Sequence, residues 1–65
     1  MIIYQNEKYV VTQSEINKRV TFGKKLPDGC IETKWHLSLD KTAQILTADE
    51  GKNLLEQGLT LLGLK

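Results

Sequence analysis

Two apolar, β-prone segments with polar residues between them predict a short hairpin in the first third of the chain, followed by a loop. Ile2–Tyr4 and Tyr9–Thr12 are rich in β-branched and aromatic residues, and four polar residues separate them. In the next segment, residues 13–17, Ser14 could cap one helical turn, or the segment could be a polar connection between strands. We predict a loop there.

A second, longer hairpin is predicted for residues 18–39. Its first strand alternates Val20, Phe22 and Leu26 with polar residues. The segment 27–29, Pro-Asp-Gly, predicts a tight turn, because proline fixes φ, aspartate accepts backbone hydrogen bonds and glycine tolerates positive φ. Strict alternation along the next strand predicts one buried face and one polar face. The buried face would hold Ile31, Thr33, Trp35, Leu37 and Leu39, with Trp35 as the main core residue, and the polar face Cys30, Glu32, Lys34, His36 and Ser38.

The last part of the chain predicts one amphipathic helix. Thr47 and Glu50 have the spacing of a capping box and Gly63 is placed to end the helix, so we expect it over residues 48–62. Gly51 and Gly58 lie near the middle of its apolar arc. There they would leave room for Trp35 or Phe22 of the sheet, and a second helix across a two-fold axis is the alternative. Residues 40–46 fit either a fifth strand or an extended lead into the helix.

These elements predict an α+β fold: a small antiparallel meander of four strands, or five, with the C-terminal amphipathic helix packed on one face. We expect a single domain over residues 1–65, with the sheet in 1–46 and the helix in 47–63. A chain this short buries only about 60% of the surface that its unfolded form exposes. One cysteine and one histidine exclude an internal disulfide and the common Cys/His zinc sites, so oligomerisation remains as the way to complete the core. We therefore expect a homodimer, with Leu54, Gly58, Leu61 and Leu62 as candidate interface residues.

The residues give no support to catalysis. Cys30 and His36 would lie on the same face of one strand, but six residues at about 3.3 Å each place them roughly 20 Å apart, beyond the reach of a nucleophile and its base. The acidic residues are scattered, and no glycine-rich phosphate-binding loop is present. We expect no enzyme activity, no cofactor and no metal.

The distribution of basic residues suggests nucleic-acid binding as the alternative function. The formal net charge is only +1, but residues 18–41 hold six basic and three acidic side chains. One face of the second hairpin would gather donors for nucleic-acid phosphates, although no aromatic residue accompanies them there. The candidate nucleic-acid-binding residues are Arg19, Lys25, Lys34 and His36.

The chain has no basic n-region followed by a long apolar segment, and its longest nearly apolar stretch, residues 59–64, is far too short to span a bilayer. We expect a cytoplasmic protein without a membrane partner. The function favoured by these patterns is a small non-catalytic protein-interaction module, homodimeric, such as a bacterial or phage accessory, adaptor or inhibitor protein of unknown partner. The alternative is a protein that binds single-stranded nucleic acid or a duplex backbone.

Overall fold

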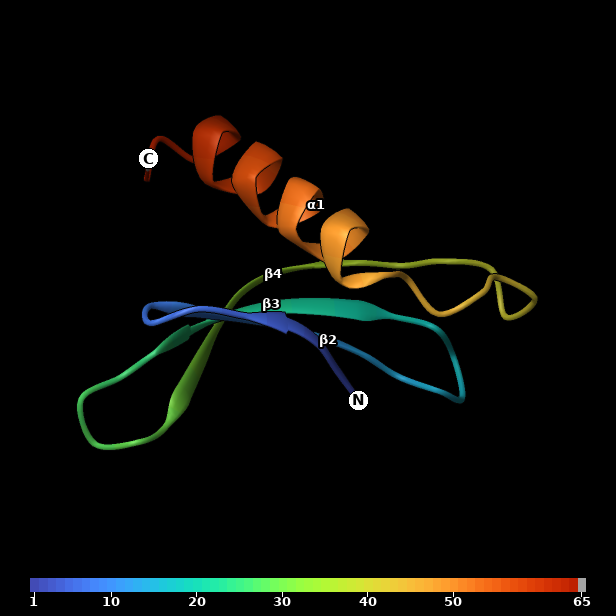
Figure 1. Ribbon diagram of the computed structural model, residues 1–65, viewed down its shortest axis with the longest axis horizontal. Coiled ribbons are helices and arrows are strands. Elements are labelled where there is room, and N and C mark those ends of the chain that lie inside the picture. Colours follow the sequence, from blue (N-terminus) through green and yellow to red (C-terminus); the bar gives the residue numbers. More distant parts are fainter. Residues whose placement is uncertain (65) are drawn as a thin grey trace.

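A computed structural model, which describes residues 1–64, has the α+β architecture expected from the sequence (Figure 1). Four antiparallel strands form one sheet in the order β1-β2-β3-β4, and a C-terminal helix lies on one face. No strand forms in residues 40–46, and no helix within residues 1–64 is long and apolar enough to cross a membrane. The elements are β1 (Ile2–Gln5), β2 (Tyr9–Gln13), β3 (Val20–Lys25), β4 (Ile31–Leu37) and α1 (Ala48–Leu61).

The turns of both hairpins are stabilised by side-chain oxygens that accept hydrogen bonds from backbone N–H groups, and one turn also contains a glycine with a positive φ angle. In the β1–β2 turn, the Asn6 side-chain oxygen accepts hydrogen bonds from the backbone N–H groups of Lys8 and Tyr9, both at 2.8 Å. In the β3–β4 turn, the N–H of Cys30 donates to the Asp28 carboxylate at 2.9 Å and Gly29 has φ 90°. Both predicted hairpins are confirmed.

Residues 14–18 form a single tight turn between β2 and β3. The Ser14 hydroxyl accepts hydrogen bonds from the backbone N–H groups of Ile16 and Asn17, so Ser14 caps this one turn. Lys18 closes it with φ 61°, a left-handed conformation that is uncommon outside glycine.

The helix begins and ends where the sequence predicts, within a residue. The Thr47 hydroxyl accepts from the backbone N–H of Glu50, and the Glu50 carboxylate accepts from the backbone N–H of Thr47, which completes the capping box. Leu62 is the C-cap, and Gly63 follows in the left-handed conformation with φ 72°.

The core lies between α1 and the face of the sheet that we call the helix side. Trp35 is half-buried rather than the centre of the core, and its indole stacks on Phe22 with ring centroids 4.7 Å apart. The indole occupies the space opposite Gly58, so an aromatic residue does cover this glycine; Gly51 instead faces Ile3 and Tyr4. The buried core residues are Ile3, Val11, Val20, Phe22, Leu55 and Leu59.

A β-bulge in β4 overturns the prediction of one continuous buried face. Phe22 pairs with Trp35, but the next residue of β3, Gly23, pairs with Thr33, so Lys34 is an extra residue. The alternation therefore shifts by one position at Lys34. Trp35, Leu37 and Leu39 lie on the helix side as expected, whereas Ile31 and Thr33 lie on the opposite face, which we call the outer face.

Gln13 is a buried polar residue that we placed in the loop after the second strand. It ends β2 and is only 1% exposed. Its amide nitrogen donates to the Lys18 carbonyl at 3.2 Å and to the Gln44 carbonyl at 3.5 Å, while its oxygen accepts from the Leu46 N–H at 2.8 Å. These bonds attach the segment before α1 to the sheet.

Candidate interaction surfaces

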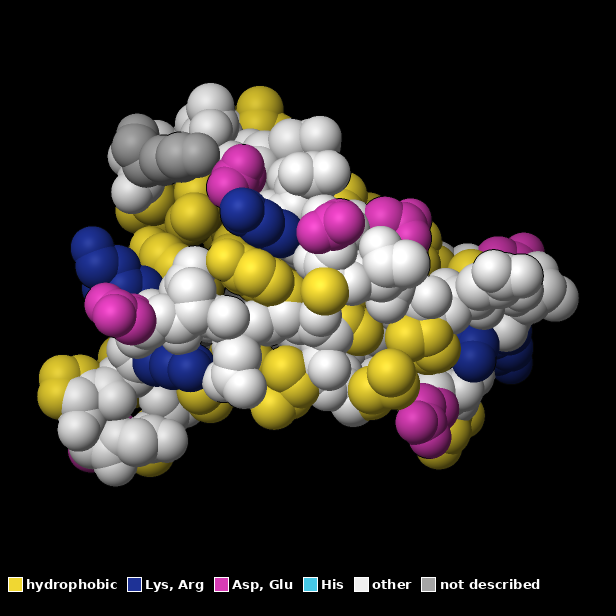
Figure 2. Space-filling view, viewed as in Figure 1, with side chains coloured by type: hydrophobic (Ala, Val, Ile, Leu, Met, Phe, Trp, Pro, Cys, Tyr) yellow, Lys and Arg dark blue, Asp and Glu magenta, His cyan; other side chains and the backbone are white. Residues whose placement is uncertain are grey.

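The four candidate nucleic-acid-binding residues do not form one basic patch. Arg19 precedes β3, while Lys25 ends it, so the strand length separates them. Lys25 donates to the Gln5 side chain at 2.8 Å, and Lys34, at the bulge, donates to Glu32 at 2.9 Å. His36 is exposed and pairs with Thr21 on the outer face. Figure 2 also shows Lys and Arg side chains at separate places on the visible side.

The candidate interface residues of the helix divide into two pairs. Leu54 is half-buried against the core, and Gly58 faces Trp35 of its own chain. Leu61 and Leu62, at the C-terminal end of α1, are 87% and 53% exposed. Only the second pair is therefore open to a partner.

The outer face of the sheet is uncovered and almost uncharged. Val10 lies near its centre, and the exposed side chains of Ile2 and Ile31 lie on it as well. Gly23 leaves room for the Ile31 side chain on this face, because a Cβ atom there would meet Ile31 and Val10. A hollow of about 370 Å³ is lined by Ile2, Gln5, Val10, Thr12, Thr21, Gly23, Lys25, Ile31 and Thr33.

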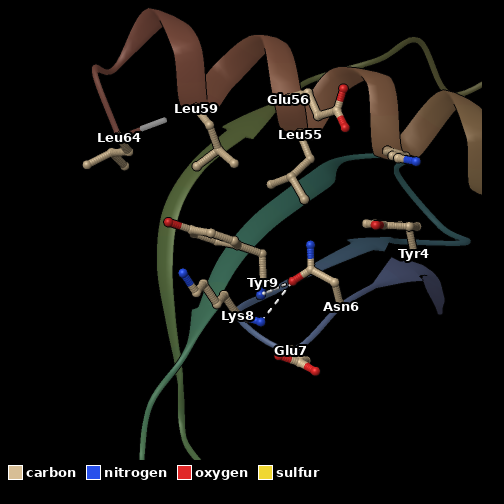
Figure 3. A pocket seen from close by; sticks show the side chains of 10 residues that line it. Tyr4, Asn6, Glu7, Lys8, Tyr9, Leu55, Glu56, Leu59 and Leu64 are labelled. Atoms are coloured by element: carbon tan, nitrogen blue, oxygen red, sulfur yellow. Dashed lines mark hydrogen bonds between the residues drawn. The ribbon is translucent and has the colours of Figure 1, made fainter.

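A second hollow lies on the helix side, between the β1–β2 hairpin and α1 (Figure 3). Tyr4 and Tyr9 contribute to it from the sheet, and Leu55 and Leu59 from the helix. We call this hollow the hairpin groove; its volume is about 520 Å³. Its other lining residues are Asn6, Glu7, Lys8, Lys52, Glu56 and Leu64.

Cys30 and His36 sit apart in this fold. Cys30 is an exposed free thiol in the β3–β4 turn, and His36 lies near the other end of β4. Within residues 1–64, no group of three or more His, Cys, Asp or Glu side chains is arranged to hold a metal ion.

Three exposed carboxylates have pKa values below their ordinary range. The backbone N–H of Cys30 lowers the pKa of Asp28, and the backbone N–H of Thr42 lowers that of Asp40. The pKa of Glu32 is lowered by its hydrogen bond from Lys34 and by the charge of that lysine. These groups stabilise turns and the bulged strand, and none of them lines either hollow.

The sequence patterns did not predict either hollow. The composition of the outer face was not predicted, because the bulge places Ile31 and Thr33 there. The hairpin groove was not predicted, because it depends on the position of α1 over β1 and β2, which local patterns do not specify. The one available signal was the pair Tyr4 and Tyr9, the aromatic residues outside the predicted core. No protein-family model, no curated protein and no solved structure matches this chain.

Proposed function

We propose that the protein is a non-catalytic protein-interaction module that works as a homodimer, and that two copies pack through the outer faces of their sheets. The observation that carries the proposal is the composition of this face. Ile2 and Ile31 are 56% and 50% exposed on it, and its one lysine, Lys25, is hydrogen-bonded to Gln5. The solvated face of an antiparallel sheet usually carries polar side chains, whereas this face also exposes two isoleucines beside its threonines.

The total surface supports this proposal. The molecule exposes 4616 Å², whereas a compact monomer of 7.4 kDa is expected to expose about 4,200 Å². A larger exposed area than that of a compact monomer is expected when a helix covers only one of the two faces of the sheet. An interface between two outer faces would bury apolar area that the single chain leaves in water.

The dimensions of the molecule limit the outer face. The molecule measures 34 × 25 × 17 Å, and the layers of sheet and helix are stacked across the 25 Å direction (Figure 1). The outer face is therefore smaller than 34 by 17 Å, because these extents also include the loops around the sheet. A specific interface buries about 1,000 Å² in total, so a dimer of this kind would have to use most of the face.

The alternative function, nucleic-acid binding, is not favoured by a specific observation. Two of its four candidate residues, Lys25 and Lys34, are engaged with Gln5 and Glu32. We therefore propose the outer face as the partner surface, with a second copy of the chain as its occupant.

The test is the oligomeric mass of the wild type and two variants, measured by light scattering between about 1 and 100 µM. The wild type is expected at twice 7.4 kDa in this range. Ile31→Lys places a charge in the proposed interface and is expected to weaken dimerisation at least tenfold. Leu61→Lys adds the same charge to the exposed end of the helix and should leave the dimer intact. Circular dichroism confirms that each variant is folded.

Two outcomes would overturn the proposal. A wild-type protein that stays monomeric at 100 µM has no such dimer. A dimer that is lost in Leu61→Lys and kept in Ile31→Lys uses the helix end instead of the sheet.

A further inference from the structure

The hairpin groove is a second surface, on the opposite side of the sheet from the proposed dimer interface, so it remains open when two copies pack. Part of its wall is apolar: the side chains of Tyr9 and Leu59 face each other across it, and Leu55 lies farther along the helix (Figure 3). Its volume of about 520 Å³ falls in the range of ligand pockets, about 300 to 1,000 Å³.

Asn6 presents a fixed hydrogen-bond donor to this groove. A backbone N–H can only donate, so the Asn6 side-chain atom that accepts from both Lys8 and Tyr9 must be the oxygen. The amide nitrogen therefore points the other way, toward the helix and into the groove (Figure 3). Because two hydrogen bonds hold this orientation, the donor is in place before any ligand arrives.

Two lysines line the same groove. Lys8 lies two residues after Asn6 on the hairpin, and Lys52 belongs to α1. Within residues 1–64, neither ammonium group has an ion-pair partner. Of the two acidic residues of the lining, Glu7 points away from the groove beneath the hairpin, and Glu56 lies on the helix wall (Figure 3). The donors that face the groove are thus suited to an acceptor with a single negative charge.

We propose that the hairpin groove binds a peptide segment of another protein in which an aromatic or large apolar side chain stands next to an Asp or Glu. The apolar side chain packs between Tyr9 and the leucines of α1. The neighbouring carboxylate accepts from the Asn6 amide, and the ammonium groups of Lys8 and Lys52 in the groove lining favour a negatively charged ligand.

The test is an NMR titration of the ¹⁵N-labelled protein with two capped peptides. One is Ac-Asn-Phe-Asp-Leu-NH₂, which carries a single carboxylate, and the other is its uncharged counterpart, Ac-Asn-Phe-Asn-Leu-NH₂. We expect the acidic peptide to shift the side-chain amide signals of Asn6 and the backbone signals of Tyr9 and Leu59. We expect its affinity to be at least tenfold higher than that of the uncharged peptide.

Three variants separate the donors from general charge. Asn6→Asp keeps an acceptor for the Lys8 and Tyr9 N–H groups but turns an oxygen toward the groove, so binding should fall at least tenfold. Lys8→Glu should have a similar effect. Lys41→Glu, in the turn at the far end of the molecule from the groove (Figure 1), changes the net charge equally and should alter binding less than twofold.

Equal affinity for the two peptides would overturn the proposal, as would full binding by Asn6→Asp. The titration is repeated on Ile31→Lys, which carries a charge on the outer face. If the monomeric Ile31→Lys protein binds the acidic peptide, the groove works independently of the dimer. If this variant does not bind the peptide, the groove is not an independent site.

Discussion

The backbone N–H of Leu46 donates a 2.8 Å hydrogen bond to the side-chain oxygen of Gln13, a residue 33 positions earlier in the chain. The same side chain also bonds to the carbonyl of Lys18. One buried amide thus joins the end of β2, the β2–β3 turn and the segment that leads into α1. No buried side-chain nitrogen or oxygen within residues 1–64 lacks a hydrogen-bond partner, so this junction is fully satisfied.

Gln13→Ala is expected to lower the free energy of unfolding by about 2 to 3 kcal/mol, because it leaves buried backbone groups unpaired and opens a small cavity. Urea denaturation followed by circular dichroism measures the change. Gln57→Ala, an equal truncation at an exposed helix position, is the control and should change stability by less than about 0.5 kcal/mol. Similar losses for the two variants would contradict the role of Gln13.

Gly58→Ala is expected to destabilise the protein although alanine favours helix by about 1 kcal/mol. The new methyl group would meet the Trp35 indole, which cannot move freely because it stacks on Phe22. Overpacking of this kind costs about 1 to 3 kcal/mol. Gly51→Ala, which meets the flexible tip of Ile3 at 3.1 Å, should cost less.

A double-mutant cycle isolates the contact between Gly58 and Trp35. In a Trp35→Leu background, Gly58→Ala should become neutral or stabilising, by up to about 1 kcal/mol, because only the helix propensity remains. The measurement is chemical denaturation of all four proteins. An unchanged cost of Gly58→Ala in the Trp35→Leu background would show that the clash lies elsewhere.

Lys18→Gly is expected to stabilise the protein. The left-handed conformation costs a residue other than glycine about 1 to 2 kcal/mol, and the entropy of glycine in the unfolded chain offsets roughly half of this. We expect a gain of about 0.5 to 1 kcal/mol in urea denaturation. Lys24→Gly, at an ordinary position of β3, should instead destabilise by about 1 kcal/mol.

Acid is expected to weaken the fold through Asp28 and Asp40. Hydrogen bonds to their carboxylates lower both pKa values in the folded state, so the unfolded state takes up protons at a higher pH. Their stabilising contribution is present above their ordinary pKa of 3.8 and is lost as the pH falls through the lowered values. The urea midpoint should therefore decrease below about pH 4.

The matched variant is the double substitution Asp28→Asn and Asp40→Asn. Asparagine keeps a side-chain acceptor in each turn but does not titrate there. The urea midpoint of this variant should depend less on pH between about 2.5 and 5 than that of the wild type. The same acid dependence in both proteins would assign the effect to other groups.

Local patterns predicted those parts of the fold that depend on neighbouring residues. The capping box of Thr47 and Glu50 and the turn at Asp28 and Gly29 are examples, because each is formed by side chains a few positions apart. The bulge at Lys34 was missed, since the sequence alternates through it without interruption and only the pairing with β3 reveals the extra residue. The position of α1 over β1 and β2 decides both candidate surfaces, and it depends on contacts across the whole chain.

The bulge at Lys34 also determines how β4 aligns with a related sequence. The faces of β4 are those that a regular strand would have if position 34 were deleted: Thr33 would still pair with Gly23, and Trp35 with Phe22. A gene that lacks this single codon would encode the same two surfaces. When such a sequence is aligned with this chain, a one-residue gap at Lys34 keeps Ile31 on the outer face and Trp35 on the helix side. An alignment without the gap assigns the residues of half the strand to the wrong face.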